Sequence, residues 1–150
     1  MTVSPEINVD SLKTRLDKLE QRISSDERSL LIEPWKVVSY SNSIASYDGG
    51  ANWYVGEYTK DRFGFVHCRG LIRRTSGVTS QLFTLPVGYR PRLAEMVVLP
   101  GRSSPSGVPT DWVFRGDVNA NGVCTVSPTV GQTWDGAYLS ISAICFYAEQ

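Results

Sequence analysis

The residues to examine first are those that could take part in catalysis or bind a metal. They are one histidine, His67, and three cysteines, Cys68, Cys124 and Cys145. A zinc site brings several such ligands at short spacings, and a nucleophilic enzyme shows a recognisable motif around its serine or cysteine. The sequence has neither pattern, so we predict no catalytic residue, no metal ligand and no cofactor. We expect free, mostly buried thiols. One alternative requires three copies of the chain to assemble: a ring of their three His67 side chains around the trimer axis would bind a metal or an anion.

Paired carboxylates are the second chemistry to consider, because glycoside cleavage uses two acidic side chains at a defined separation. Five acidic residues in the β-like part of the chain could meet in space: Glu57, Glu95, Asp111, Asp117 and Asp135. The same residues are equally typical of the ordinary surface of a β-domain. We therefore expect the protein not to be an enzyme. Cleavage of a polysaccharide is the least favoured of the functions considered for it.

Aromatic side chains near expected loops and strand ends indicate a binding function. They are Tyr47, Trp53, Tyr54, Tyr58, Trp112 and Trp134. Sugar rings pack on Trp and Tyr faces, while neighbouring acids accept hydrogen bonds from the hydroxyls. The pairs Asp111-Trp112 and Trp134-Asp135 suit this chemistry, and loops at one end of a β-scaffold often carry binding residues. These four residues are the predicted ligand-binding site. In the alternative interpretation, the aromatic residues fill the core and a trimer interface.

From Trp35 onward, the elements that must position these residues are predicted to be strands, because apolar and polar residues alternate between turn signals. The Asn121-Gly122 pair predicts a hairpin with a primed two-residue turn. Residues 100–110 are expected to form a loop. The strands are expected within residues 35–40, 52–58, 62–74, 80–85, 94–99, 111–126 and 137–148. The fold class predicted for residues 34–150 is therefore mainly β, a sandwich or barrel.

Residues 1–33 are expected to form a separate N-terminal segment that contains a helix. Its apolar residues recur at alternating steps of three and four, the spacing of a coiled-coil seam. These seam residues are Val9, Leu12, Leu16, Leu19 and Ile23. In parallel helices, Arg15 would pair with Glu20 of a neighbouring copy, and Arg22 with Glu27. The alternative is a helix packed on its own domain. Two heptads are marginal alone in water, so further contacts must hold the copies together.

Charge and hydropathy exclude some partners. The 15 basic and 15 acidic residues give a formal net charge of zero, so no basic nucleic-acid footprint is visible. The N-terminal residues lack the basic start and apolar core of a signal peptide. The apolar runs are too short to span a membrane. We expect neither nucleic-acid binding nor membrane insertion.

Two groups of motifs resemble a known family. The run Arg15-Leu16-Asp17-Lys18-Leu19-Glu20 resembles the trimer-favouring coiled-coil pattern. Residues 50–150 resemble the C-terminal β-domains of bacteriophage fibre and receptor-binding proteins. The resemblance rests on residues 58–72, 83–92, 116–126 and 134–149, and Leu-Pro-x-Gly-Tyr-Arg-Pro in the second stretch is the most specific part. In that part, Pro86 and Pro91 fix φ and Gly88 can take a positive φ, so Tyr89 is expected to be held rigidly as a fold or trimer contact.

The resemblance implies a homotrimer on the surface of a virion, at the tail tip or the capsid exterior. It implies a short parallel trimeric coiled coil followed by a β-knob. The N-terminal residues Met1, Thr2, Val3, Ser4 and Pro5 would attach to other virion proteins. The knob would bind host cell-surface polysaccharide. The alternative is a capsid head-fibre or decoration protein with a mainly structural role.

Overall fold

The computed structural model describes residues 9–29, 33–77, 80–103, 110–127, 134–135 and 137–149. The chain divides into two compact units, Met1–Leu31 and Ile32–Gln150. Within the described residues, the first unit contains one helix and the second contains all the strands. The predicted virion anchor, Met1, Thr2, Val3, Ser4 and Pro5, lies outside the described residues.

The helix α1 (Val9–Ser29) forms where the sequence predicts a helix. Asp10 lies in its first turn, where the helix dipole favours a negative charge. All five seam side chains are exposed, by between 48% and 71%. The apolar stripe is present, whereas its pairing in a trimeric coiled coil stays a prediction. Among the described residues, no helix combines the length and apolar character that a membrane span requires.

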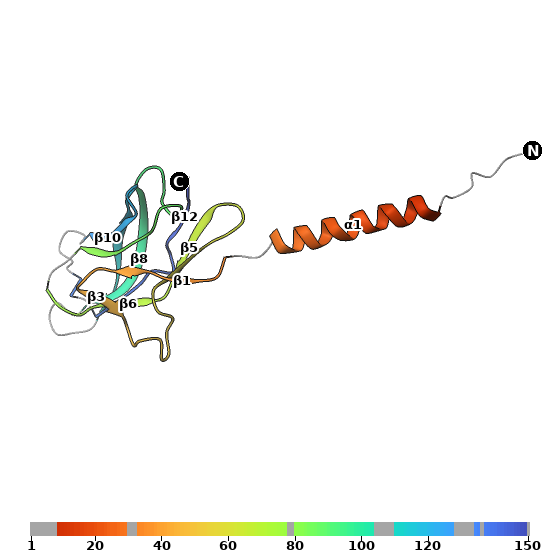
Figure 1. Ribbon diagram of the computed structural model, residues 1–150. Helices are drawn as coiled ribbons and strands as arrows, with labels where there is room; N and C mark the ends of the chain where they lie inside the picture. Colours follow the sequence, from red (N-terminus) through yellow and green to blue (C-terminus); the bar gives the residue numbers. More distant parts are fainter. Residues whose placement is uncertain are drawn as a thin grey trace, which may run out of the picture. The chain divides into compact units, whose positions relative to one another are not determined.

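The described strands form two antiparallel sheets (Figure 1). The four-stranded sheet has the order β1 (Lys36–Val37), β4 (Glu57–Lys60), β5 (Phe65–Arg69) and β12 (Cys145–Tyr147). The eight-stranded sheet has the order β2 (Ser39–Tyr40), β7 (Gln81–Thr84), β10 (Val123–Ser127), β9 (Thr110–Val118), β8 (Glu95–Ser103), β11 (Tyr138–Ser140), β6 (Leu71–Arg74) and β3 (Ile44–Ser46). The predicted mainly β fold is confirmed.

The eight-stranded sheet is nearly closed into a barrel. Its two edge strands, β2 and β3, are consecutive in the chain and therefore lie close together. A short turn joins β2 to β3, and the Ile44 N–H donates to the Ser41 carbonyl at 3.0 Å. The same turn is held to the strands on either side. The Ser41 N–H donates to Leu82 at 3.0 Å, and the Thr75 N–H donates to Ser43 at 2.8 Å.

The two sheets also share chain segments. Only Val38 separates β1 from β2, and only Gly70 separates β5 from β6. Gly70 has a φ of 118°, and a Cβ there would lie 2.0 Å from the Val55 carbonyl oxygen. Only glycine tolerates this backbone conformation and close approach. The predicted single strand over residues 62–74 is therefore two strands in different sheets.

One apolar core connects the sheets. Phe83 and Phe114 from the eight-stranded sheet join Val66 and Phe146 from the four-stranded sheet, and each is exposed by 5% or less. Burial of each such side chain contributes about 1.5–3 kcal/mol. Strand β10 shows the expected alternation, because Cys124 and Val126 are buried between less buried neighbours.

The structure corrects the sequence prediction at the C-terminal strand. Residues 137–148 were expected to form one strand, and the alternation of a single strand would place Leu139, Ile141, Ala143 and Cys145 on one apolar face. Instead a turn follows Ile141, and the Ile144 N–H donates to the Ile141 carbonyl at 3.1 Å. The turn reverses the alternation, so Ile144 is buried and Cys145 is exposed.

Two other local predictions were also wrong in detail. Residues 100–103 were expected in a loop, yet they complete strand β8, which pairs with β9 and β11. The β9–β10 connection has four residues rather than two. Its Gly122 N–H donates to the Asn119 carbonyl at 2.8 Å, and no residue other than glycine has a positive φ among the described residues.

The second unit, Ile32–Gln150, is called the β-unit below. The Leu-Pro-x-Gly-Tyr-Arg-Pro element contacts residues near the start of this unit. Gly88 has a φ of 90°, and the Tyr89 N–H closes the turn onto the Pro86 carbonyl at 3.1 Å. The Tyr89 hydroxyl donates to the Glu33 carboxylate, which also accepts a hydrogen bond from Lys36. The Lys36 bond and then the Tyr89 bond lower the pKa of Glu33. Tyr89 is thus a fold contact, one of its two predicted roles.

Candidate functional site

The loop between β3 and β4 presents three aromatic side chains. Tyr47, Trp53 and Tyr54 are exposed by 36%, 56% and 63%. The Asp48 carboxylate organises the loop by accepting hydrogen bonds from the Gly50 N–H at 3.0 Å and the Asn52 N–H at 2.7 Å. Burial alone would raise the pKa of Asp48, but these backbone bonds lower it. The loop therefore has a defined shape although it carries exposed rings.

Both ends of this loop are fastened to one residue of β6. The Tyr47 N–H donates to the Leu71 carbonyl at 2.9 Å, and the Leu71 N–H donates to the Tyr54 carbonyl at 3.0 Å. These two bonds hold Tyr47 and Tyr54 at the two sides of a hollow of 440 Å³. It is lined by Tyr47, Trp53, Tyr54, Gly70, Leu71, Tyr138, Ser140 and Ser142.

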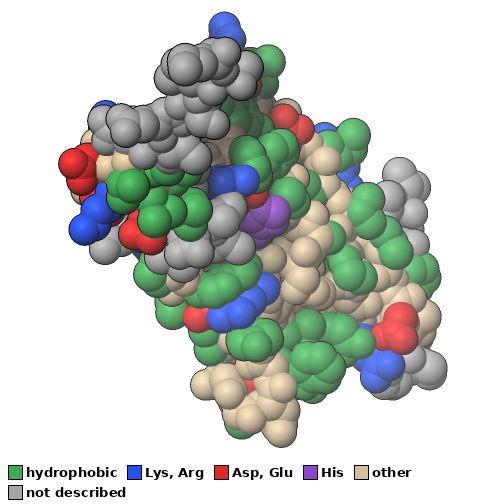
Figure 2. Space-filling view, turned by 90° about the vertical axis from the view of Figure 1, so that its right-hand side faces the viewer, with side chains coloured by type: hydrophobic (Ala, Val, Ile, Leu, Met, Phe, Trp, Pro, Cys, Tyr) green, Lys and Arg blue, Asp and Glu red, His purple; other side chains and the backbone are tan. Residues whose placement is uncertain are grey.

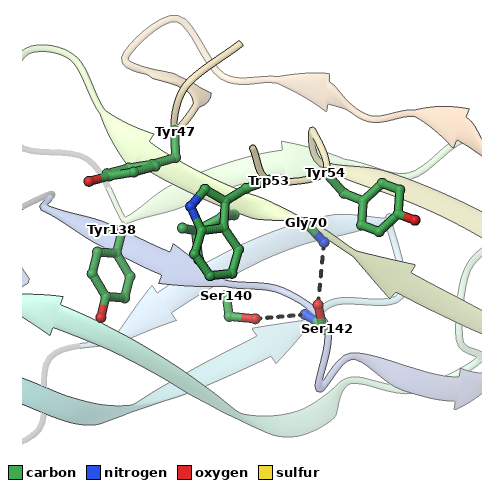
Figure 3. A pocket seen from close by; sticks show the side chains of 8 residues that line it. Tyr47, Trp53, Tyr54, Gly70, Tyr138, Ser140 and Ser142 are labelled. Carbon is green, nitrogen blue, oxygen red and sulfur yellow. Dashed lines mark hydrogen bonds between the residues drawn. The ribbon is translucent and has the colours of Figure 1, made fainter. Parts of the chain in front are cut away.

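The lining of this hollow combines aromatic rings with small polar groups. In Figure 3 the Trp53 ring lies between Tyr47 and Tyr138 on one side and Tyr54 on the other. Tyr47 and Tyr138 meet edge to face, with ring centroids 5.8 Å apart. At the side of the hollow formed by Gly70 and Ser142, the Gly70 N–H donates to the Ser142 hydroxyl at 3.3 Å (Figure 3). Such a surface offers flat apolar faces with hydroxyl groups beside them.

A second hollow, of 390 Å³, lies on the other side of Tyr138 and shares Tyr138 and Ser140 with the first. Asp111 and Trp112 of β9 also line it. Arg102 Nε donates to Asp111 Oδ1 at 2.8 Å, and the Tyr138 hydroxyl donates to the same oxygen at 3.2 Å. The Arg102 bond and then the Tyr138 bond lower the pKa of Asp111, so this carboxylate stays ionised as an acceptor.

A third hollow, of 720 Å³, adjoins the first because Trp53 and Tyr54 line both. Its polar group is an ion pair in which Arg69 Nε donates to Glu57 Oε2 at 2.8 Å. The Arg69 guanidinium carbon lies 4.1 Å from the Trp35 ring centroid and 3.9 Å from that of Tyr54. These cation–π contacts fix the orientation of the Tyr54 ring.

The three hollows form one continuous surface, called the aromatic surface below. Its rings are those of Tyr47, Trp53, Tyr54, Trp112 and Tyr138. Its charged groups are two arginine–carboxylate pairs, Arg102–Asp111 and Arg69–Glu57.

The four sequence-predicted ligand residues gather at one end of the β8–β9 hairpin, but they differ in exposure. Asp111 is exposed and Trp112 is half-buried, and both line the second hollow. Trp134 is only 3% exposed, and its indole N–H donates to the Tyr138 carbonyl at 3.3 Å. Asp135 is exposed, and its backbone N–H donates to the Ser103 hydroxyl at 3.0 Å.

The positions of Trp134 and Asp135 change their expected roles. A buried indole cannot stack on a ligand, so Trp134 belongs to the core that supports Tyr138, as the alternative interpretation of the aromatic residues held. Among the described residues, the indole nitrogen of Trp112 is the buried side-chain nitrogen or oxygen atom that has no hydrogen-bond partner.

Tyr138 and Arg102 are not among the residues predicted from the sequence. Tyr47, Trp53 and Tyr54 were predicted as aromatic residues near loops, outside the predicted site. The Asp48-Gly49-Gly50 turn signal just before Trp53 marks an exposed loop and could have favoured them. No sequence signal reveals that Tyr138 lies against Tyr47, because that contact depends on the pairing of β11 with β6.

The acidic residues considered for glycoside cleavage are mostly held by arginines. Glu57 pairs with Arg69, Asp111 pairs with Arg102, and Asp117 pairs with Arg115 at 2.9 Å. A glycosidase needs one carboxyl group with a raised pKa to act as the acid, whereas the pKa of Asp111 is lowered. An ionised carboxylate held in this way accepts hydrogen bonds.

No family model and no curated protein sequence matches this chain. Within the described part of the chain, no group of three or more His, Cys, Asp or Glu residues is placed to hold a metal ion.

Proposed function

We propose that the protein is a phage virion structural protein, a homotrimeric fibre or spike whose β-unit binds host cell-surface glycans through the aromatic surface. The observation that supports this proposal is the continuity of three hollows lined by exposed Trp and Tyr rings. Two arginine–carboxylate pairs lie beside those rings. Proteins that recognise sugars need this combination of apolar faces and fixed polar groups.

The aromatic surface offers separate contacts to successive sugar rings. Trp53 and Tyr54 present the largest exposed faces, and a pyranose ring can pack its C–H face on either of them. Asp111 accepts hydrogen bonds and Arg102 donates them, so together they can bind neighbouring hydroxyl groups. Each site is open and therefore weak. Three copies on one particle would raise the overall avidity for a repetitive polysaccharide.

Trimer formation is supported by the exposed seam of α1. Its two heptads are too short to hold three chains alone, so the β-units must supply additional contact area. The outer face of the β8–β9 hairpin carries exposed Met96 and Val98, at 68% and 59%. We assign this strip to contact with other copies of the chain, because the Arg115–Asp117 pair lies beside it and presents both signs of charge.

The direct test is binding to host capsule or lipopolysaccharide, with Trp53→Ala as the main variant. Loss of one stacking ring should weaken binding about fivefold, while the free energy of unfolding changes little because Trp53 is exposed. Phe63→Ala is the matched control, since Phe63 is 64% exposed and lies outside the aromatic surface. Equal binding by Trp53→Ala and the unaltered protein would contradict the proposed site.

The location on the particle is tested separately by immunogold labelling of virions with antibodies against the β-unit. Gold at the tail tip is the expected result for host recognition. Gold distributed over the head, together with no glycan binding, would instead identify a capsid fibre or decoration protein.

A further inference from the structure

A second cluster, separate from the aromatic surface, joins a thiol, an imidazole and a carboxylate. Cys145 Sγ lies 3.5 Å from His67 Nδ1, and His67 Nε2 lies 3.1 Å from Asp61 Oδ2. Cys145 belongs to β12 and His67 to β5, and the two residues are direct cross-strand partners. The Cys68 N–H donates to the Ile144 carbonyl at 3.0 Å, so the adjacent His67–Cys145 pair is a non-hydrogen-bonded pair. Side chains approach each other most closely in such pairs.

Asp61 is fixed in place by its own backbone surroundings. Its Oδ1 accepts hydrogen bonds from the Phe63 N–H and the Phe65 N–H, both at 2.9 Å, which leaves Oδ2 directed at His67. Burial alone would raise the pKa of Asp61, but the bond from His67 and the two backbone bonds lower it. An ionised carboxylate only accepts hydrogen bonds. His67 therefore donates from Nε2, and the lone pair on Nδ1 faces the Cys145 thiol.

This thiol is accessible, whereas the other two are not. Cys145 is exposed, while Cys68 and Cys124 are buried, at 4% and 1% exposure. Burial raises the pKa of the Cys68 thiol to about 12 and raises that of Cys124 well above its usual range. The His67 side chain is 40% exposed, and Figure 2 shows the single histidine at the molecular surface. A reagent can therefore reach Sγ and its base together.

We propose that Cys145 is an activated nucleophile that exchanges with small disulfides, with His67 as its base and Asp61 as the positioning residue. The order thiol, imidazole and carboxylate is that of nucleophile, base and orienting group. Disulfide exchange fits an open site on an edge strand, because it requires only an accessible thiol and a clear approach to sulfur, with no enclosing pocket. The exposed Phe65 and Tyr147 rings, 5.6 Å apart, lie on the same face and can contact the carbon chain of the disulfide.

The reaction balances without an added oxidant. His67 Nδ1 takes the Cys145 proton as Sγ attacks one sulfur of the disulfide RS–SR. A bond forms between Sγ and that sulfur while the original S–S bond breaks. The leaving RS⁻ takes the proton from His67 and departs as RSH. Cys145 ends as a mixed disulfide, and one equivalent of thiol is released.

The test measures the rate at which the folded full-length chain releases thionitrobenzoate from dithiobis(nitrobenzoate) at pH 7. One thiol per chain should react quickly, and the two buried thiols only after denaturant is added. Cys145→Ser should abolish the fast reaction. His67→Gln should slow it about 100-fold, the low end of the range for general-base catalysis, because thiols are already good nucleophiles.

Asp61→Asn separates a chemical role from a structural one. The amide oxygen of asparagine can still accept both backbone bonds, while its NH₂ group donates to His67 Nε2. The His67 proton then moves to Nδ1, which can no longer accept the thiol proton. We expect a rate loss similar to that of His67→Gln, with the same single accessible thiol. The control is Glu95→Gln, which replaces an exposed carboxylate on β8 of the other sheet and should react like the unaltered protein.

A parallel incubation with oxidised glutathione, read by intact mass, should give one adduct on Cys145. The proposal is overturned if His67→Gln and Asp61→Asn both react at the unaltered rate, because Cys145 would then be an ordinary exposed thiol. It is equally overturned if the native chain exposes no reactive thiol or all three. If His67→Gln does not fold, Asp61→Asn decides, since it keeps both backbone hydrogen bonds.

Discussion

The substitution Gly70→Ala tests how the junction of the two sheets supports the aromatic surface. Gly70 has a φ of 118°, and an added Cβ would lie 2.0 Å from the Val55 oxygen and 2.5 Å from its carbonyl carbon. A non-glycine residue in this backbone conformation costs about 1–3 kcal/mol. The overlap with backbone atoms adds to that cost, because the loop cannot move without disturbing the hydrogen bond between Leu71 and Tyr54.

We therefore expect Gly70→Ala to lower the free energy of unfolding by more than about 3 kcal/mol, a large part of the roughly 5–15 kcal/mol typical of a domain. Urea denaturation followed by tryptophan fluorescence measures this change. Displacement of Val55 also shifts Tyr54, so glycan binding should weaken under conditions where the variant is still folded.

Gly49→Ala is the matched control for this experiment. Gly49 also has a positive φ, 73°, but a Cβ there would meet nothing within 4 Å. Gly49→Ala should lower the free energy of unfolding only by the cost of the left-handed backbone conformation, about 1–2 kcal/mol. If the two variants differ by less than about 0.5 kcal/mol, the close approach of Gly70 to Val55 does not restrict the sheet junction as we argue.

Two further predictions concern the helix of the first unit and Glu33, near the start of the β-unit. Leu16→Ser combined with Leu19→Ser should reduce helicity by circular dichroism and shift the proposed trimer toward monomer in sedimentation. Lys18→Ser, off the seam, should do neither, and equal behaviour of the two variants would contradict the proposed coiled coil. Glu33 has a lowered pKa, so its contribution to stability is present above its unfolded pKa and is lost as pH falls through the folded value. Glu33→Gln should thus cost about 1 kcal/mol or less at pH 7, since the group is partly exposed, and this cost should shrink as the pH falls through the folded pKa of Glu33. A difference in urea midpoint that stays constant with pH would refute this.

The sequence alone determined the features that depend on neighbouring residues. The three-and-four spacing of apolar residues predicted α1, because side chains at those spacings share one face of a helix. The alternation of apolar and polar residues predicted the β class, and Gly88 between Pro86 and Pro91 predicted the turn that holds Tyr89. Each of these signals extends over a few residues and reflects local sterics.

The features that the sequence missed depend on how distant strands pair. Gly70 breaks one predicted strand into two because its neighbour in space is Val55, and the turn after Ile141 reverses the alternation that was expected to bury Cys145. A shift of one residue moves every side chain of a strand to the opposite face. Only the tertiary structure therefore decided that Trp134 lies in the core and Tyr138 on the surface. The pairing of β5 with β12 likewise decided that Cys145 faces His67, 78 residues away in the chain.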